Sequence, residues 1–490
     1  MRLRKMNHSR APMLEALAEY HKRGRYGFTP PGHRQGHGVD PRVLEIMGRE
    51  PFRDDVLASA GLDDRSSSGQ FLQSAEELMA DAVSADHAFF STCGSSLSVK
   101  AAMLAVAGHD GHLILGRDAH KSVVAGMIFS GLQPCWVSPQ WDARLHIAHP
   151  PSPAQIAEAW DRYPHAAGAL IVSPTPYGTC ADIAAIAEVC HERNKPLIVD
   201  EAWGAHLPFH EKLPTWAMDA DADVCVVSVH KMGAGFEQGS VFHLQGERVD
   251  FPHLSACADL LMTTSPNVLL YCAIDGWRRQ MVERGHELIE AALRLVERTR
   301  EQIDGLPGLR VLRKELVHEE ASHDLDPLQV LIDLSELSIS GYQAADWLRD
   351  NELIDIGLSD HARILATFSF ADDPSSAERL VGALARLTDA AGGLPRAKLV
   401  MLPDPPQLEL ETVNRPRDAF FSRFEDVKAS DAAGRIAAEQ VTPYPPGIPA
   451  ILPGERITPE VIDYLQSGVR AGMVLPDPVD PSLQTIRVMH

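Results

Sequence analysis

Short apolar runs alternate with longer segments of helical periodicity along the first half of the chain. Runs of four to eight apolar residues are typical of buried strands, and apolar residues spaced three or four apart are typical of helices. The pattern predicts helices at 73–83, 97–107 and 183–193, and strands at 88–92, 112–115, 133–138, 169–173, 196–200, 224–227 and 239–244. This alternation predicts an α/β fold with a mostly parallel sheet covered by helices.

The second half of the chain follows a different pattern. A long helix is predicted at 268–303, followed by strands at 328–334 and 362–368 mixed with helices at 342–348 and 376–391. A proline-rich stretch then precedes a last compact segment. We therefore expect five parts: an N-terminal segment (1–50), a large α/β domain (51–304), a small α+β domain (305–395), a linker (396–416) and a C-terminal α+β domain (417–490).

One of the predicted strands leads directly to a lysine. The apolar run Val224–Val227 is followed by Ser228, His230 and Lys231. A lysine that leaves a buried strand has no solvated face, so its ammonium must be paired, neutral or covalently used. An ordinary exit from a strand into a loop is the alternative.

A second predicted strand ends in Asp200 and lies about one helix upstream of the first. A carboxylate and a lysine that leave consecutive buried strands suit a pyridoxal phosphate site. In such a site, Lys231 holds the cofactor as a Schiff base, and Asp200 keeps the pyridine nitrogen protonated so that the ring accepts electrons.

Two further stretches carry polar residues that suit a phosphorylated ligand. Gly94, Ser95 and Ser96 precede a predicted helix, whose N-terminus attracts a phosphate group. A plain helix cap is the alternative. His120 follows another predicted strand, at the sheet edge where ligands collect in α/β folds.

Composition narrows the class of protein. The chain has 490 residues with 45% hydrophobic and 23% charged residues, as in soluble globular proteins. A net charge of -22 argues against nucleic-acid binding. No signal peptide, membrane-spanning run or metal-ligand spacing is present, and the seven cysteines form no CxxC pair. We expect a cytoplasmic protein with reduced thiols and no metal.

Seven motifs in order resemble the Orn/Lys/Arg decarboxylase family of fold type I pyridoxal phosphate enzymes, and they span almost the whole chain. The motifs are Pro31-Gly-His33, Ser91-Thr-Cys-Gly-Ser-Ser96, Asp118-Ala-His-Lys-Ser122, Asp200-Glu-Ala-Trp203, Ser228-Val-His-Lys231, Thr264-Ser-Pro266, and Tyr444-Pro-Pro-Gly-Ile-Pro449 with Pro453-Gly-Glu455. The chain is similar to the short form of the family, which lacks an N-terminal regulatory wing.

The resemblance implies a role for each matching residue. Lys231 is the expected Schiff-base lysine, and His230 or His120 delivers protons, with His120 against the cofactor ring. The other residues expected around the cofactor and substrate are Asp200 (pyridine nitrogen), Ala202 (ring face), Trp203 (pocket wall), Ser95, Ser96 and Ser228 (phosphate), Thr264 or Ser265 (phosphate, from a second subunit), and Glu455 with Trp203 (substrate).

The expected reaction is α-decarboxylation of arginine, lysine or ornithine by a homodimer or higher homo-oligomer, a step of polyamine biosynthesis. Two positions depart from the family pattern: Gly357 stands where an acidic residue is expected, and Phe236 and Glu237 replace a small polar pair. These departures leave open transamination or oxidation of an arginine-like amino acid. A catalytically silent interaction protein and an unrelated α/β domain are the remaining alternatives.

Overall fold

The computed structural model describes residues 6–490 except 59–61, 63–69, 320 and 445–446. Residues 1–5 of the predicted N-terminal segment and Pro445 and Pro446 of the expected C-terminal motif therefore lie outside the described residues. The chain forms two compact units: Met1–Ala105 with Ile198–Glu287, and Val106–Leu197 with Leu288–His490. This division crosses the predicted domain boundaries, which stay predictions.

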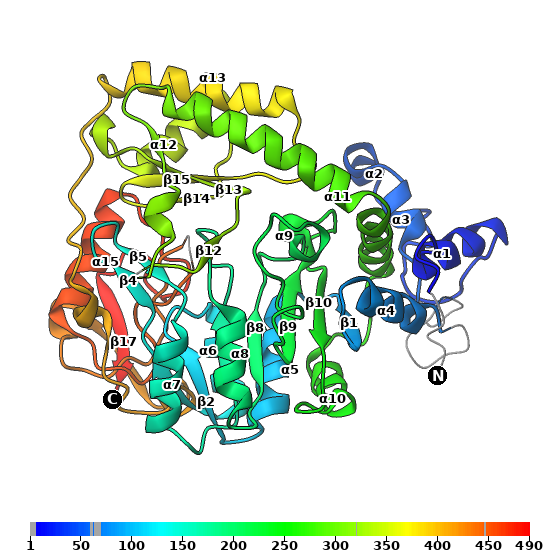
Figure 1. The fold of residues 1–490 in the computed structure, drawn as a ribbon, viewed down its shortest axis with the longest axis horizontal. Helices are drawn as coiled ribbons and strands as arrows, with labels where there is room; N and C mark the ends of the chain where they lie inside the picture. Colours follow the sequence, from blue (N-terminus) through cyan, green and yellow to red (C-terminus); the bar gives the residue numbers. More distant parts are fainter. Residues whose placement is uncertain (1–5, 59–61, 63–69, 320, 445–446) are drawn as a thin grey trace. The chain divides into compact units, whose positions relative to one another are not determined.

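The first unit contains four neighbouring strands in the order β1-β10-β9-β8 (Figure 1). Strands β8 and β9 are parallel, whereas β10 is antiparallel to both β9 and β1. All residues of β8, β9 and β10 are buried, which explains why their sequences are mostly apolar and do not alternate between apolar and polar residues. Their bounds are His87–Ser91 (β1), Leu197–Asp200 (β8), Val224–Ser228 (β9) and Ser240–Leu244 (β10).

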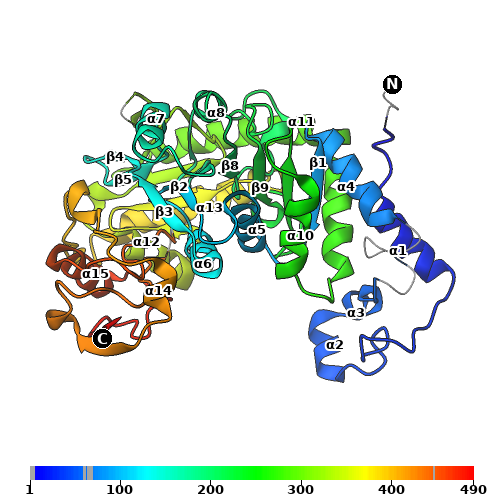
Figure 2. The same ribbon diagram turned by 90° about the horizontal axis from the view of Figure 1, so that it is seen from below.

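Helices surround these strands. Helix α1 packs beside α4, and the short helices α2 and α3 follow α1 in the N-terminal segment (Figure 2). The helices of this unit are α1 (Pro12–Lys22), α2 (Pro41–Met47), α3 (Glu50–Asp54), α4 (Phe71–Ala82), α5 (Ser95–Ala107), the 3-10 helix η1 (Leu207–Phe209), α9 (Val229–Met232), α10 (Phe251–Leu261) and the first half of α11 (Val268–Asp304).

The second unit contains three parallel strands in the order β6-β2-β3, together with smaller sheets. One is antiparallel with the order β11-β13-β15-β14, and the pairs β4–β5, β7–β12 and β16–β17 are antiparallel as well. The strands are β2 (His112–Gly116), β3 (Gln133–Val137), β4 (Gln140–Asp142), β5 (Ile147–His149), β6 (Ala169–Val172), β7 (Thr179–Cys180), β11 (Arg310–Val311), β12 (Asp324–Leu325), β13 (Gln329–Asp333), β14 (Leu358–Ser359), β15 (Arg363–Thr367), β16 (Phe424–Lys428) and β17 (Thr485–Met489).

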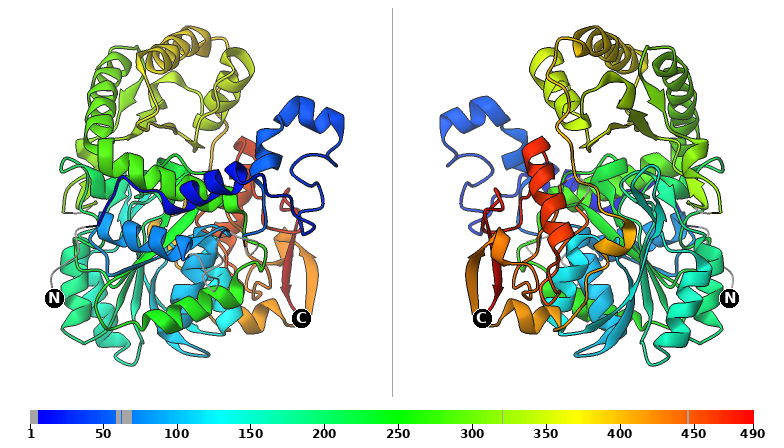
Figure 3. Two further views of the ribbon diagram at one scale, coloured as in Figure 1. Left: turned by 90° about the vertical axis from the view of Figure 1, so that its right-hand side faces the viewer. Right: turned by 90° about the vertical axis from the view of Figure 1, so that its left-hand side faces the viewer.

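The helices of the second unit cover these sheets. Helix α12 packs on β14 and β15, and the C-terminal segment places β17 (red) beside β16 (orange) in Figure 3. The helices are α6 (Lys121–Ser130), α7 (Pro153–Arg162), α8 (Ile183–His191), α12 (Gly341–Trp347), α13 (Pro374–Ala391), α14 (Pro416–Phe420) and α15 (Pro459–Ala471), with short turns η2 (Lys314–Leu316), η3 (Ser335–Leu337), η4 (Leu348–Glu352), η5 (Pro405–Leu408) and η6 (Ala429–Asp431).

The predicted α/β organisation is confirmed, with one qualification. Parallel pairing holds for β8–β9, β2–β3 and β2–β6, whereas the strand predicted at 239–244 runs antiparallel as β10. A buried strand is apolar in either direction, so its sequence did not indicate which way it runs. Among the helices of the described residues, none has the length and apolarity needed to cross a membrane.

A buried ion pair fastens the N-terminal helix to α11. Asp275 accepts a hydrogen bond from the Met13 backbone N–H (2.9 Å) and pairs with Arg278 (2.8 Å), and both charged side chains are fully buried. The Arg278 guanidinium also donates to the backbone carbonyls of His8 and Arg10. Each partner therefore satisfies a charge that burial would otherwise leave unpaired.

We expect Arg278→Met to destabilise the protein by about 3–5 kcal/mol, because it leaves the Asp275 charge buried and unpaired. Urea unfolding followed by circular dichroism measures the loss. Arg284→Met is the matched control on the same helix: Arg284 is exposed and pairs only with Glu287, so the change should stay within about 0.5 kcal/mol. Equal effects of the two variants would contradict the anchoring role.

Candidate active site

The ends of two parallel neighbouring strands bring Asp200 and Lys231 to one edge of the first unit. Asp200 is the last residue of β8, opposite Val226 of β9, and Lys231 follows the end of β9 within the short helix α9. The carboxyl ends of adjacent parallel strands form the edge where ligands bind in α/β sheets. The predicted pair is therefore brought together within one unit.

Burial shifts the ionisation of both groups. Burial lowers the pKa of Lys231. The neighbouring Asp200 carboxylate acts in the opposite direction and raises it. Burial also raises the pKa of Asp200 to about 6, against the attraction of Lys231 and a hydrogen bond from the Ala202 backbone N–H (3.2 Å). The Lys231 Nζ lies 4.4 Å from the centre of the Trp203 ring, where an ammonium gains a cation–π interaction.

The start of α5 and the end of β9 bring two of the predicted phosphate-binding serines together. The Ser228 hydroxyl donates to the Ser95 hydroxyl (2.7 Å), and Ser95 is the first residue of α5. Gly94 has a φ of +75°, which is unfavourable for other residues and places the turn directly before the helix N-terminus. Ser96 is exposed beside them. Hydroxyls and a helix N-terminus together suit an anion such as phosphate.

The remaining residues predicted near Lys231 have defined partners. Ala202 is buried, and its carbonyl accepts from the Ser228 N–H (3.3 Å). His230 Nδ1 lies 3.1 Å from the Gly239 carbonyl and must donate its proton there. Burial lowers the pKa of His230, so this imidazole is neutral at pH 7. Its Nε2 is then a proton acceptor.

The two ends of the segment that connects β9 to β10 are held together by hydrogen bonding. Ser228 and Ser240 are opposite each other in the ladder, and the Val229 N–H donates to the Gly239 carbonyl (2.9 Å). Phe236 and Glu237, one of the two departures from the family pattern, are exposed in this connection. The other departure, Gly357, is exposed in the second unit.

Sequence reasoning missed Glu201, which is fully buried next to Asp200. Its Oε2 accepts from the Cys225 thiol (3.1 Å) and the Ala217 N–H (3.3 Å). Burial raises the pKa of Glu201 well above its ordinary value, and the two hydrogen bonds oppose this shift. An acid inside an otherwise apolar stretch was the signal available in the sequence.

Three other predicted site residues lie in other parts of the chain. Thr264 and Ser265 are exposed between α10 and α11, and their contribution to a second subunit stays a prediction. His120 belongs to the second unit, where it caps α6 through a hydrogen bond from the Ser122 N–H to Nδ1 (3.2 Å). Its contact with the cofactor also stays a prediction.

Glu455 makes a buried ion pair in the second unit. The Arg117 guanidinium donates to both carboxylate oxygens, with Nε–Oε1 at 3.2 Å and Nη2–Oε2 at 3.0 Å, and Glu455 is 1% exposed. The Leu452 N–H donates to the same carboxylate (2.8 Å). The predicted contact of Glu455 with a substrate cation stays a prediction, and the pair with Arg117 counts against it because the charge is already balanced.

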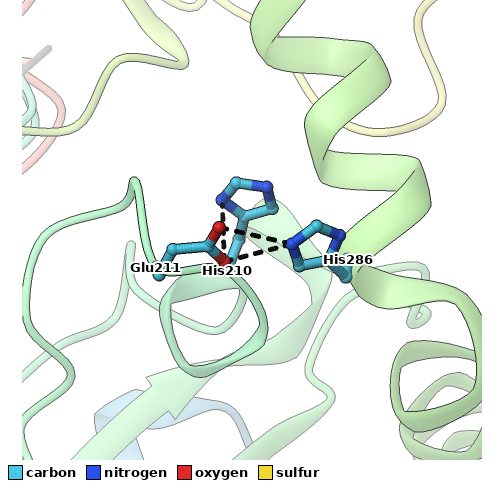
Figure 4. Close-up of side chains that lie close together, drawn as sticks. All are labelled: His210, Glu211 and His286. Atoms are coloured by element: carbon cyan, nitrogen blue, oxygen red, sulfur yellow. Dashed lines mark hydrogen bonds and ion pairs between the residues drawn. The ribbon is translucent and has the colours of Figure 1, made fainter.

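One group of three side chains within the described residues could share a metal ion: His210, Glu211 and His286 (Figure 4). His286 Nε2 lies 3.1 Å from Glu211 Oε2, and the two imidazole rings stack with centres 4.4 Å apart. The Lys212 N–H donates to His210 Nδ1 (3.1 Å), which uses the lone pair that a metal at this atom needs. We assign the group an ion-pairing role that joins α11 to the segment after β8.

Asp118, in the same motif as His120, has a strongly shifted ionisation. Burial raises its pKa to about 7, against its own backbone N–H and the Arg117 charge. Neither carboxyl oxygen has a hydrogen-bond partner elsewhere in the described part of the chain. The folded protein therefore binds this proton more tightly than the unfolded chain between about pH 4 and pH 7, and stability falls as pH rises through this window.

We expect Asp118→Asn to unfold at higher urea concentration than the unchanged protein at pH 8, and at a similar concentration at pH 4. A shift of about three pH units corresponds to a gain of up to about 4 kcal/mol above pH 7. Urea titrations at pH 4, 6 and 8 measure this difference. Asp161→Asn is the control, because Asp161 is exposed on α7. A gain that does not change with pH would contradict the burial argument.

Comparisons with known proteins agree on one family. The model of the Orn/Lys/Arg decarboxylase major domain matches residues 11–376, and that of the C-terminal domain matches residues 401–477. The chain is 35% identical to an arginine decarboxylase of Halalkalibacterium halodurans over 98% of this chain and 97% of the relative. It is 34% identical to an arginine decarboxylase of Bacillus subtilis over 99% of each.

The fold is similar to that of the Escherichia coli constitutive lysine decarboxylase, with a TM-score of 0.83 and 20% identity. The similarity covers 98% of this chain and 82% of that one. This structural likeness shows the fold, and the family models and the sequence relatives show the membership. The chain belongs to the Orn/Lys/Arg decarboxylase family.

Proposed function

We propose that the protein is a pyridoxal-phosphate-dependent decarboxylase that removes the α-carboxylate of a basic amino acid, with arginine as the first candidate. Arginine is favoured because the relatives at 34–35% identity are named arginine decarboxylases. The single observation that carries the proposal is the buried pairing of Lys231 with Asp200 at the ends of β8 and β9.

The residues present fit pyridoxal phosphate. Lys231 offers a buried amine with a lowered pKa, and Asp200 offers a buried carboxyl that needs a cationic partner. Ser95 at the start of α5 and Ser228 at the end of β9 suit the phosphate. Bound at this place, pyridoxal phosphate supplies an electron sink for the bond that breaks at the substrate α-carbon.

Lys231 and the side chains around it have separate roles in binding the cofactor and moving protons. The lowered pKa of Lys231 keeps its amine available for a covalent bond to the cofactor. Asp200 stays ionised once it faces a protonated ring nitrogen, because the opposite charge offsets the cost of burial. His230, neutral and oriented by the Gly239 carbonyl, exchanges a proton at Nε2. His120 and the Thr264–Ser265 segment of a second subunit complete the proposed site of a homodimer.

We expect the protein with pyridoxal phosphate to convert one of arginine, lysine or ornithine into equal amounts of CO₂ and the corresponding amine. Parallel measurement of CO₂, amine and keto acid identifies both the reaction and the substrate. A keto acid without CO₂ from all three amino acids would sink the proposal and favour the transamination or oxidation alternative.

Lys231→Ala should lower kcat by about 1,000-fold or more, as expected for the loss of a covalent catalytic group. The loss should be accompanied by release of the cofactor on gel filtration. Lys212→Ala, which removes an exposed lysine of the same unit, should keep both activity and cofactor. Full activity in Lys231→Ala would mean that the chemistry uses another residue.

Ser228→Ala and Ser95→Ala should each weaken pyridoxal phosphate binding by about 10-fold, because a hydrogen bond to a charged group is worth about 1.5–3 kcal/mol. The dissociation constant of the cofactor is measured by equilibrium dialysis. Ser98→Ala is the matched control: Ser98 lies on the same helix α5, and its hydroxyl contacts the buried Ser240 hydroxyl (3.1 Å). If Ser98→Ala weakens binding as much, the loss reflects the fold rather than the phosphate.

A further inference from the structure

The second unit contains a cavity of about 160 Å³ whose lining residues all belong to that unit. Its lining comes from the residues that follow β2 and β3, from the hairpin β4–β5 and from the C-terminal segment that includes α15 (β2, β4, β5 and α15 are labelled in Figure 1). We call it the C-terminal cavity. Its lining is Arg117, Asp118, Pro139, Trp141, the segment 146–148, Tyr177, Leu408, Glu409, Pro443, the segment 448–450 and Tyr464.

The positive charge in this lining is already balanced. Arg117 is paired with both oxygens of Glu455 and donates to the Pro449 carbonyl (2.7 Å). Burial lowers the pKa of His146, and its Nε2 lies 3.2 Å from the Pro403 carbonyl, so the imidazole is neutral and donates there. The cavity therefore presents no uncompensated cation from these two groups.

The negative groups are different. Asp118 is 4% exposed, and its carboxyl oxygens find no hydrogen-bond donor in another residue of the described chain. The Ser138 hydroxyl donates a hydrogen bond to Glu409. Because this hydroxyl is neutral, the contact does not balance the charge of the Glu409 carboxylate. A buried carboxyl without a donor is costly, and a ligand that brings a donor would remove that cost.

Aromatic rings form much of the remaining wall. Trp141 contacts His146 edge to face, with ring centres 4.7 Å apart, and Tyr464 lies on the other side of His146 at 6.3 Å. Tyr177 completes this side, with its hydroxyl 3.4 Å from Asp360. Faces of tryptophan and tyrosine attract organic cations, and their apolar area suits an alkyl chain.

We propose that the C-terminal cavity binds a small organic cation that carries a primary amine or guanidinium group, with Asp118 as its acceptor and Trp141 and Tyr464 against its alkyl chain. The site goes beyond the proposed reaction and does not depend on it. If the reaction is as proposed, its amine product has this chemistry, and the cavity is then a place where product acts back on the enzyme.

The probe is agmatine, titrated calorimetrically into the Lys231→Ala protein without pyridoxal phosphate, so that its amine has no aldehyde to condense with. We expect one equivalent to bind, because the proposed site does not use Lys231. At pH 8, where Asp118 has lost its proton, adding Asp118→Asn should weaken binding by at least about 10-fold, since it removes the charge of the acceptor. Adding Trp141→Leu tests the aromatic wall independently and should weaken binding as well.

Asp463→Asn is the matched control, because it neutralises an exposed carboxylate next to Tyr464 on α15. It should bind agmatine as tightly as the parent protein. Hexanol, which has an alkyl chain without a charge, should not compete. Unchanged affinity in both Asp118→Asn and Trp141→Leu, or no binding to the Lys231→Ala protein, would overturn the inference. Because decarboxylation is measured separately, a failed reaction with retained binding leaves this site standing.

Discussion

The burial of two opposite charges at adjacent strand ends is the constraint on which the first unit depends. Asp200 is buried and Lys231 is half-buried, and burial pushes each towards its neutral form while each draws the other towards its charged form. Such a pair is costly in desolvation free energy when its two members have no other partner. It is well suited to a ligand that supplies an aldehyde to the amine and a cationic nitrogen to the carboxylate, so the same cost prepares the site for its cofactor.

Much of this unit could be predicted from the sequence because its signals are local. The apolar runs that became β8 and β9 end in Asp200 and Lys231, and the parallel pairing of the two strands brings these side chains to one edge. The direction of β10 could not be predicted, because a strand buried on both faces has the same composition either way. The burial of Glu201 and its hydrogen bonds to Ala217 and Cys225 depend on tertiary packing, which its sequence neighbours do not reveal.

The main features that the sequence did not reveal are contacts between residues far apart in the chain. Glu455 was expected to meet a substrate cation because the family resemblance implies that role, and this contact stays a prediction. Arg117 lies 338 residues away in the chain, yet it binds both oxygens of this carboxylate. The pairing also changes how the C-terminal cavity is understood, since it directs the Arg117 guanidinium to Glu455, while the Asp118 oxygens have no hydrogen-bond donor in another of the described residues. Neither point follows from residue types alone.

The closed connection between β9 and β10 has a consequence for how the family can diversify. The segment that carries Lys231 begins and ends at paired positions, Ser228 opposite Ser240, and its base is tied by the Val229–Gly239 hydrogen bond. The exposed tip belongs to the same connection as Lys231, and the Phe236 carbonyl accepts from the Gly239 N–H (3.0 Å). A substitution at Glu237 therefore acts close to the lysine, since this carboxylate already raises the pKa of the adjacent His230 against the effect of burial.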